Sequence, residues 1–298
     1  MRALRYWRMT RPGFLLITPV ACAIGLATAH ADGHFDAWLA AITVLLATLA
    51  HAAANVLNDY EDAVNGADAA NHGAIAPFTG GAGFIQRGEA TPAQTRMLAA
   101  SLAVLLVGVG LALVAWVGIG LLWIGLAGVA LGWAYSSPPL KLMARGLGEL
   151  AVALTWWLVV IGADYVQRQE FSWMPCVLGL PYALLVANIL LANGLPDAAG
   201  DAAVGKRTLA VRLGARGAAL LYIALMLLAH LWVVIGAMLE MLPQAALWSP
   251  VSTPFSLAAA ALIEQRAATP QRLRPALVLT IVACIVHGAA MAAGLFGR

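Results

Sequence analysis

The chain has 298 residues, of which 62% are hydrophobic and 10% charged, with a formal net charge of +3 and a mean hydropathy of +0.85. Soluble globular domains carry about 25% charged residues, so this composition excludes an ordinary soluble domain and indicates a chain embedded in lipid. The basic residues are scattered over short loops, which gives no indication of nucleic-acid binding. The cysteines lie far apart and form neither a metal-binding pair nor a disulfide pattern.

Nine apolar segments are long enough to cross a bilayer as helices. In chain order they cover residues 14–31, 37–57, 98–116, 118–135, 147–163, 174–193, 217–238, 243–262 and 276–296. Abundant glycine and alanine would permit close contacts between such helices in lipid. We therefore predict an all-α membrane protein, one domain over residues 1–298, with nine transmembrane helices around a central cavity.

The distribution of positive charge predicts the orientation of these helices. With the N-terminus in the cytoplasm, all but two of the 17 Lys and Arg residues fall on the cytoplasmic side, the exceptions being Arg168 and Arg298. An excess of basic residues in cytoplasmic loops favours this arrangement. We expect a bacterial-type inner membrane, with the N-terminus inside and the C-terminus outside.

The N-terminal segment has a second interpretation. Residues 1–11 are rich in arginine, and the apolar run that follows ends in Ala29-His30-Ala31, as in a cleavable signal peptide. The run is nevertheless long enough to span a bilayer, and its removal would take one helix from a consistent bundle. We therefore predict a retained first helix.

The first long polar break follows the second apolar segment and is rich in acids and amides. Asn55 and Asp59 are four residues apart and Asp59 and Asp62 are three apart, so they share one face if the helix continues, with Asn58 beside them. Each aspartate at bilayer depth costs roughly 2.5–3.5 kcal/mol, so this cluster needs water, an interface or a cation. His51, two turns earlier, is interpreted as a hydrogen-bonded intramembrane histidine outside the site.

The second long polar break follows the sixth segment and repeats the pattern. Asn193 precedes Asp197 and Asp201, which are four residues apart and again share a helix face. A solvated acidic loop explains one such motif equally well, but two copies, each after an even-numbered helix, indicate a common site. We predict pseudo-repeat halves of about 1–140 and 141–262, followed by the last helix at 276–296, with both motifs facing one cavity.

The residue types in the two motifs indicate Mg²⁺, which prefers oxygen ligands and binds through one or two carboxylates plus substrate phosphates. The predicted ligands are Asp59, Asp62, Asp197 and Asp201. The only two lysines, Lys141 and Lys206, lie in cytoplasmic loops and would offer positive charge to a phosphate. Positive-inside topology explains the same lysines without any binding role, so both interpretations stay open.

Together these motifs resemble the UbiA superfamily of intramembrane prenyltransferases, and the resemblance covers nearly the whole chain. Further matching strings are Arg11-Pro12, Gly80-Gly81, Tyr135-Ser-Ser-Pro-Pro-Leu-Lys141 and Gly205-Lys-Arg-Thr-Leu-Ala-Val-Arg-Leu-Gly214. The last string and the double glycine are most similar to the 1,4-dihydroxy-2-naphthoate polyprenyltransferases of the menaquinone branch.

This resemblance implies Mg²⁺-dependent transfer of a polyprenyl group from a polyprenyl diphosphate to an aromatic acceptor, in a protein surrounded by membrane lipid. It implies that the four aspartates are catalytic and that other polar residues contact the substrates. These are Asn55, Asn58, Tyr135, Lys141, Arg145, Asn193 and Lys206. The sequence does not define the oligomeric state or the prenyl chain length.

Two departures from the pattern concern the acceptor. Gly80-Gly81-Ala82-Gly83 lacks the arginine of the Gly-Gly-Ser-Arg string usual in the naphthoate branch, and Gly194 stands where relatives often carry an acid. Alternative acceptors are 4-hydroxybenzoate, homogentisate, or a lipid or haem compound. A secondary transporter is a further alternative, since repeats and polar groups at bilayer depth serve transport as well. The clustering of acids at helix ends favours the enzyme.

Overall fold

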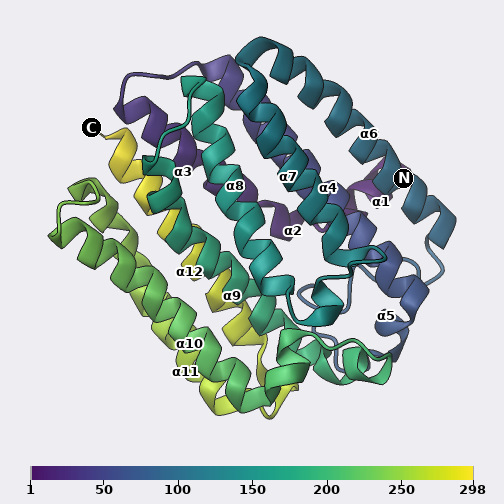
Figure 1. Cartoon of the computed structure of the whole chain (residues 1–298). Coiled ribbons are helices and arrows are strands. Elements are labelled where there is room, and N and C mark those ends of the chain that lie inside the picture. The colour runs from purple at the N-terminus through teal and green to yellow at the C-terminus, as the bar shows by residue number, and fades with distance from the viewer. Residues whose placement is uncertain (1, 298) are drawn as a thin grey trace.

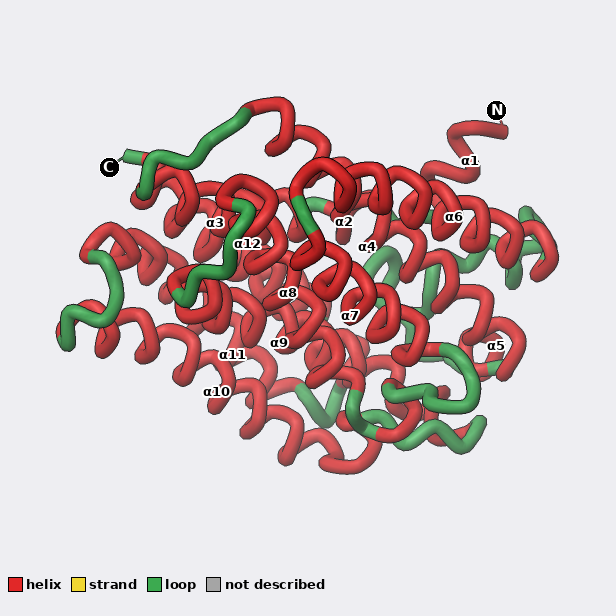
Figure 2. The backbone as a smooth tube through the Cα atoms, turned by 45° about the horizontal axis from the view of Figure 1, so that its top comes forward, coloured by secondary structure: helices red, strands yellow, loops and turns green. Residues whose placement is uncertain are grey.

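The computed structural model describes residues 2–297 as a bundle of helices, with loops at the helix ends (Figure 2). Within these residues, nine helical segments are long and apolar enough to span a membrane, which confirms the predicted count and fold class. They are α2 with α3 (Pro12–Leu15 and Ile17–Ala31), α4 (Ala37–Asn65), α6 (Pro92–Val117), α7 (Ile119–Ser136), α8 (Gly148–Arg168), α9 (Met174–Ala203), α10 (Leu209–Met238), η2 with α11 (Gln244–Ser252 and Thr253–Arg266) and α12 (Arg274–Phe296). The short elements are α1 (Arg2–Met9), α5 (Ala67–Ala70), η1 (Met143–Arg145) and η3 (Pro270–Arg272). In Figure 1, α10 and α11 border one side of the bundle and α6 the other.

Helices α3 and α9 form the interior of this integral membrane protein. Helix α3 packs against α8, α9 and α12, and α9 also packs against α8 and α10. Cys22 and Ile24 on α3 are fully buried. Gly25 permits the close crossing with α8, because a Cβ there would lie 2.1 Å from the carbonyl oxygen of Val160. The first apolar segment is thus an interior helix of the bundle.

A partly buried ion cluster joins α3 to α8 at the end remote from the aspartate motifs. Arg168 donates from Nε to Asp164 Oδ2 at 3.1 Å and from Nη2 to the Thr28 carbonyl at 3.2 Å. Its Nη2 also lies 2.9 Å from Asp32 Oδ2. Thr28 donates its hydroxyl to Asp164 Oδ1 at 2.7 Å. Asp164 is 1% exposed, so this arginine neutralises a carboxylate that has almost no access to water.

Several helices, among them α4, α6, α8, α9 and α10, extend further than the hydropathy pattern predicts, and α4 and α9 carry the motifs. Helix α4 continues to Asn65, where Gly66 ends it with a φ of 83°, and α9 continues to Ala203. The polar residues of these extensions face a cavity while their other faces pack, so the helix persists where the sequence stops being apolar. Helix α10 begins at Leu209, where the Thr208 side chain caps it, and a non-helical Gly214 kinks it between this first part and the long apolar part.

Candidate active site

The first motif lies on one face of the last turns of α4. Asn55, Asn58 and Asp62 line a cavity of about 490 Å³, and Asp59, beside them, is 7% exposed. Asn58 donates to Asp62 Oδ2 at 3.1 Å and to Ser136 Oγ at 3.2 Å, which fixes the carboxylate against the end of α7. The helix that the spacing required is therefore present.

The second motif lies on α9, on the opposite side of the same cavity. Asn193, Asp197 and Asp201 follow one another at intervals of four residues and all line the cavity. Pro196 lies between them inside the helix and offers no N–H to the preceding turn. Gly194 also lines the cavity, and a Cβ there would meet Ala210 at 3.2 Å, so α10 packs closely against this position.

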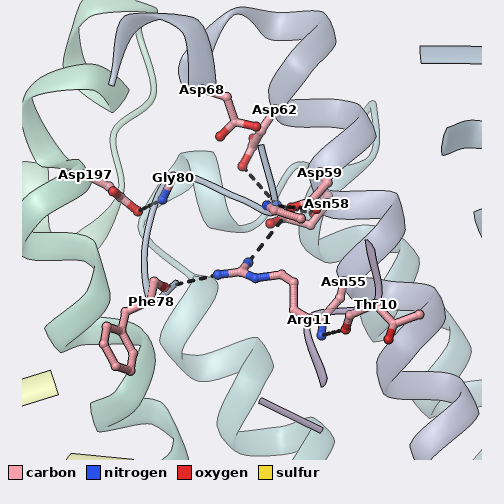
Figure 3. Close-up of polar contacts among 12 residues, drawn as sticks. Thr10, Arg11, Asn55, Asn58, Asp59, Asp62, Asp68, Phe78, Gly80 and Asp197 are labelled. Atoms are coloured by element: carbon pink, nitrogen blue, oxygen red, sulfur yellow. Dashed lines mark hydrogen bonds and ion pairs between the residues drawn. The ribbon is translucent and has the colours of Figure 1, made fainter. Parts of the chain in front are cut away.

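One loop, residues 71–86, connects the two motifs by hydrogen bonds. Asn71 donates its side-chain amide to Asp197 Oδ1 at 2.5 Å, and the Gly80 N–H donates to Asp197 Oδ2 at 3.4 Å. The Ala82 N–H donates to Asp59 Oδ2 at 3.1 Å. In Figure 3, Asp197 and Asp59 lie on either side of the loop segment that carries Gly80. The loop therefore sets the separation of the two carboxylate groups.

Gly81 lies where this loop approaches the carboxylates most closely. Its φ is +67°, and a Cβ there would lie 2.9 Å from Asp68 Oδ2 and 3.0 Å from Asp59 Oδ1. Both the positive φ and the lack of space for a Cβ require glycine at this point. Gly83, two residues after Gly81, is approached by the side chain of Arg87. A Cβ added at Gly83 would lie 2.6 Å from Arg87 Nη1. A guanidinium thus lies beside the position where the naphthoate branch usually carries arginine.

Lys206 joins the two motifs directly across the cavity. Its Nζ lies 2.5 Å from Asp62 Oδ1 and 3.3 Å from Asp201 Oδ1, and its side chain is 6% exposed. Burial alone would lower the pKa of Lys206, but the Asp62 and Asp201 carboxylates outweigh it and raise the pKa. The two carboxylates therefore favour the charged form of Lys206 in the acidic pocket.

Two further charged residues belong to the pocket although the sequence interpretation left them outside the site. Arg11 donates from Nη2 to the Phe78 carbonyl at 3.1 Å and its Nη1 lies 4.0 Å from Asp59 Oδ1 (Figure 3). Asp68 on α5 lies beside Gly81 and accepts from Gln86 at 3.1 Å. Burial, and then the charges of Asp62 and Asp59, raises the pKa of Asp68 to about 7. Its place in the same acidic stretch as Asp59 was the signal that could have identified it.

Among the described residues, one carboxylate oxygen of the pocket is left without a hydrogen-bond partner. Asp59 Oδ1 is buried and accepts no hydrogen bond, although polar atoms removed from water normally have a partner. Across residues 2–297, no group of three Asp, Glu, His or Cys side chains is arranged to hold an ion unaided. This donor set fits Mg²⁺, which completes its coordination with water and substrate phosphate oxygens.

The cavity changes from polar to apolar along its length. Its polar end contains the two motifs, while its other end extends between α6, which packs mainly on α4, and α7, which packs on α8. The apolar lining includes Leu106, Leu113, Leu122, Ile124, Val129 and Leu131.

The structure brings most of the predicted substrate-contacting residues to this cavity. Asn55, Asn58, Tyr135, Asn193 and Lys206 line it. The Asn55 amide donates to the Thr10 carbonyl at 3.0 Å, which leaves its side-chain oxygen for a ligand. Two predicted residues stand apart from the lining: Lys141, in the turn after α7, and Arg145, which is exposed and donates to the Pro139 carbonyl at 2.8 Å.

These features define an integral membrane protein whose apolar cavity ends in a pocket of opposed carboxylates. The chain belongs to the UbiA prenyltransferase family, whose model matches residues 17–281. It is a prenyltransferase, which confirms the resemblance inferred from the motifs and removes the transporter alternative.

Similar proteins share both sequence and fold with this chain. A 1,4-dihydroxy-2-naphthoate octaprenyltransferase from Escherichia coli is 30% identical over 96% of this chain and 93% of its own length. A protein of the same name from Mycobacterium leprae is 30% identical over 94% of this chain and 91% of its own length. Two UbiA homologs of solved structure, each 16% identical, share the fold: that of Aeropyrum pernix has a TM-score of 0.69 and covers 93% of this chain and 96% of its own. The homolog of Archaeoglobus fulgidus, solved bound to GPP and Mg²⁺, has a TM-score of 0.61. The match covers 97% of this chain and 99% of the homolog.

Proposed function

We propose that this protein transfers a polyprenyl group from a polyprenyl diphosphate to 1,4-dihydroxy-2-naphthoate, with Mg²⁺, in menaquinone biosynthesis. The observation that carries the proposal is the pair of carboxylate motifs, on α4 and α9, that face each other at the polar end of an apolar cavity. The names of the two curated relatives support the naphthoate acceptor. The GPP and Mg²⁺ bound to the Archaeoglobus fulgidus homolog support the donor and the metal.

In this proposal the four aspartates, Asp59, Asp62, Asp197 and Asp201, hold the metal. When bound, Mg²⁺ supplies charge stabilisation for the departing diphosphate. Asp68 lies close enough to Asp59 to share this role.

The other polar residues of the pocket bind and orient the diphosphate. Lys206 exchanges its two carboxylate partners for phosphate oxygens, and Arg11 adds a guanidinium from the side of the loop. Asn55 and Asn58 contribute amide groups. The face of the Tyr135 ring stabilises the allylic cation, and the apolar walls from α6 and α7 exclude water from it.

The cellular arrangement is part of the same proposal. We place the protein in a bacterial inner membrane with the N-terminus and the pocket on the cytoplasmic side, supported by the distribution of Lys and Arg. Residues 1–140 and 141–262 form the two pseudo-repeat halves. Access of a protease to an N-terminal tag in inverted and right-side-out vesicles tests the orientation.

The experiment that tests the function measures transfer of a radiolabelled prenyl group by purified protein in nanodiscs. We expect turnover with 1,4-dihydroxy-2-naphthoate and Mg²⁺, and none after addition of EDTA. Asp59→Asn and Asp197→Asn should each abolish it, because each removes a negative ligand while preserving size. Glu170→Gln, an exposed acid after α8 and remote from the pocket, is the matched control and should keep full turnover.

Two outcomes would contradict parts of this proposal. Turnover that survives in both aspartate variants would refute the metal mechanism. Transfer only to 4-hydroxybenzoate, homogentisate, or a lipid or haem compound in a parallel screen would refute the naphthoate acceptor and retain the rest.

A further inference from the structure

The cavity-facing stripe of α4 continues past the first motif to a histidine. His51 lines the same cavity as Asn55, Asn58 and Asp62, and lies one turn beyond Asn55 in the direction of the apolar end. At a rise of about 1.5 Å per residue, His51 is about 12 Å along the helix axis from Asp59. It therefore stands where the polar and apolar parts of the cavity meet.

The imidazole of His51 is fixed from two sides. Its Nδ1 is 2.8 Å from the hydroxyl oxygen of Thr18, which is 1% exposed on α3. Its ring makes an edge-to-face contact with Trp156 on α8, with ring centroids 4.8 Å apart and an interplanar angle of 89°. A side chain held by two other helices cannot rotate freely, so the direction of its second nitrogen is set by the fold.

That second nitrogen is left without a hydrogen-bond partner among the described residues. Residues 2–297 show no hydrogen bond to His51 Nε2, and the Nε1 of Trp156, whose ring contacts the imidazole, is buried without a partner. Unpaired nitrogen groups in an apolar cavity cost free energy that a ligand recovers by bonding to them. Such an arrangement fits a binding site better than a structural contact.

We propose that His51 binds a ring hydroxyl of the aromatic acceptor, and that His51, Thr18 and Trp156 form the acceptor subsite. This proposal rests on the function proposed above. A hydroxyl both donates and accepts, so it pairs with Nε2 in either tautomer of the imidazole. Trp156 offers an aromatic wall, while Phe14 and Ile17 line the cavity nearby. His51 is a positioning residue that turns the ring toward the carbon released from the diphosphate.

Two substitutions at one position distinguish binding by Nε2 from packing by the ring. His51→Gln places an amide near the position of Nε2, whereas His51→Asn reaches only as far as Nδ1. We expect His51→Asn to raise the acceptor KM about tenfold, the worth of one good hydrogen bond, with the donor KM unchanged. His51→Gln should restore most of the affinity. His34→Asn, an exposed histidine between α3 and α4, is the matched control.

A substrate analogue provides a readout that a purely structural role would not change. Acceptor analogues in which one ring hydroxyl is replaced by hydrogen provide the comparison. The analogue that lacks the hydroxyl bound by His51 should bind the unaltered protein about tenfold more weakly than the acceptor does, whereas His51→Asn should bind this analogue and the acceptor equally. Thr18→Val, which removes the hydroxyl that orients the imidazole, gives the same comparison if His51→Asn fails to fold.

The proposal is overturned if the analogue loses affinity equally in the unaltered protein and in these variants, or if the donor KM rises as much as the acceptor KM. Such a result, with Asp59→Asn and Asp197→Asn inactive, refutes the acceptor subsite alone. Activity in the aspartate variants would refute the proposed function instead.

Discussion

Gly81 allows a specific test of the pocket geometry, because Gly88, a few residues after the 71–86 loop and before α6, is a matched control. The two glycines have φ values of +67° and +68°, but a Cβ at Gly81 would lie 2.9 Å from Asp68 Oδ2 and 3.0 Å from Asp59 Oδ1, whereas a Cβ at Gly88 would meet nothing within 4 Å. Alanine in either place has a backbone cost of about 1–2 kcal/mol. Only Gly81→Ala also displaces two carboxylates.

A misplacement of about 1 Å in an active site costs up to about a hundredfold in rate, so we expect Gly81→Ala to lower kcat/KM by roughly tenfold to a hundredfold. It should also raise the Mg²⁺ concentration needed for half-maximal transfer. Gly88→Ala should lower the unfolding temperature similarly and leave the kinetics of the folded protein unchanged. Prenyl transfer across a Mg²⁺ titration, with thermal unfolding in parallel, measures both. Equal kinetic losses in the two variants would show that backbone strain, and not the carboxylates, matters at Gly81.

Three further expectations concern charge. Lys206→Met should lower the unfolding temperature in EDTA, since breaking a buried ion pair costs about 3–5 kcal/mol. Mg²⁺ should then raise the unfolding temperature of this variant more than that of the unaltered protein. An equal rise in both would refute the idea that Lys206 neutralises the carboxylates. Asp68 has its pKa raised from 3.8 to about 7 by burial and by Asp62 and Asp59, so it binds more protons folded than unfolded between these values. Metal-free protein should therefore lose stability as pH rises from about 4 to about 7, and Asp68→Asn should flatten this decline in thermal unfolding. Arg168→Gln leaves Asp164 unpaired and should destabilise the protein by about 3–5 kcal/mol, measured by denaturant unfolding, with KM for both substrates unchanged.

The sequence was sufficient for the helices and for the two motifs. Hydropathy identifies nine spans because lipid demands long apolar runs, and intervals of three and four residues place Asp59 with Asp62 and Asp197 with Asp201 whenever the helix continues. The sequence alone could not show where α4 and α9 end, because polar residues that face a cavity from a helix have the same composition as polar residues in a loop.

Contacts made by the loop and the N-terminal turn depend on the path of the chain and were not predictable. Asn71 reaches Asp197 and Arg11 reaches Phe78 only because the loop folds back between the motifs. Lys141 and Lys206 look equivalent in sequence, yet only Lys206 enters the pocket. His51 is hydrogen-bonded, as expected for an intramembrane histidine, but its partner Thr18 lies 33 residues away and leaves no local signal in the sequence.

The change of polarity along the cavity separates the two products of the proposed reaction. A released diphosphate is strongly hydrated and leaves by the end that carries the charged side chains. In the proposed reaction the prenylated ring is soluble in lipid and would leave along the apolar walls that α6 and α7 contribute. Neither product has to pass the other, so the protein can accept its next pair of substrates from two phases at once.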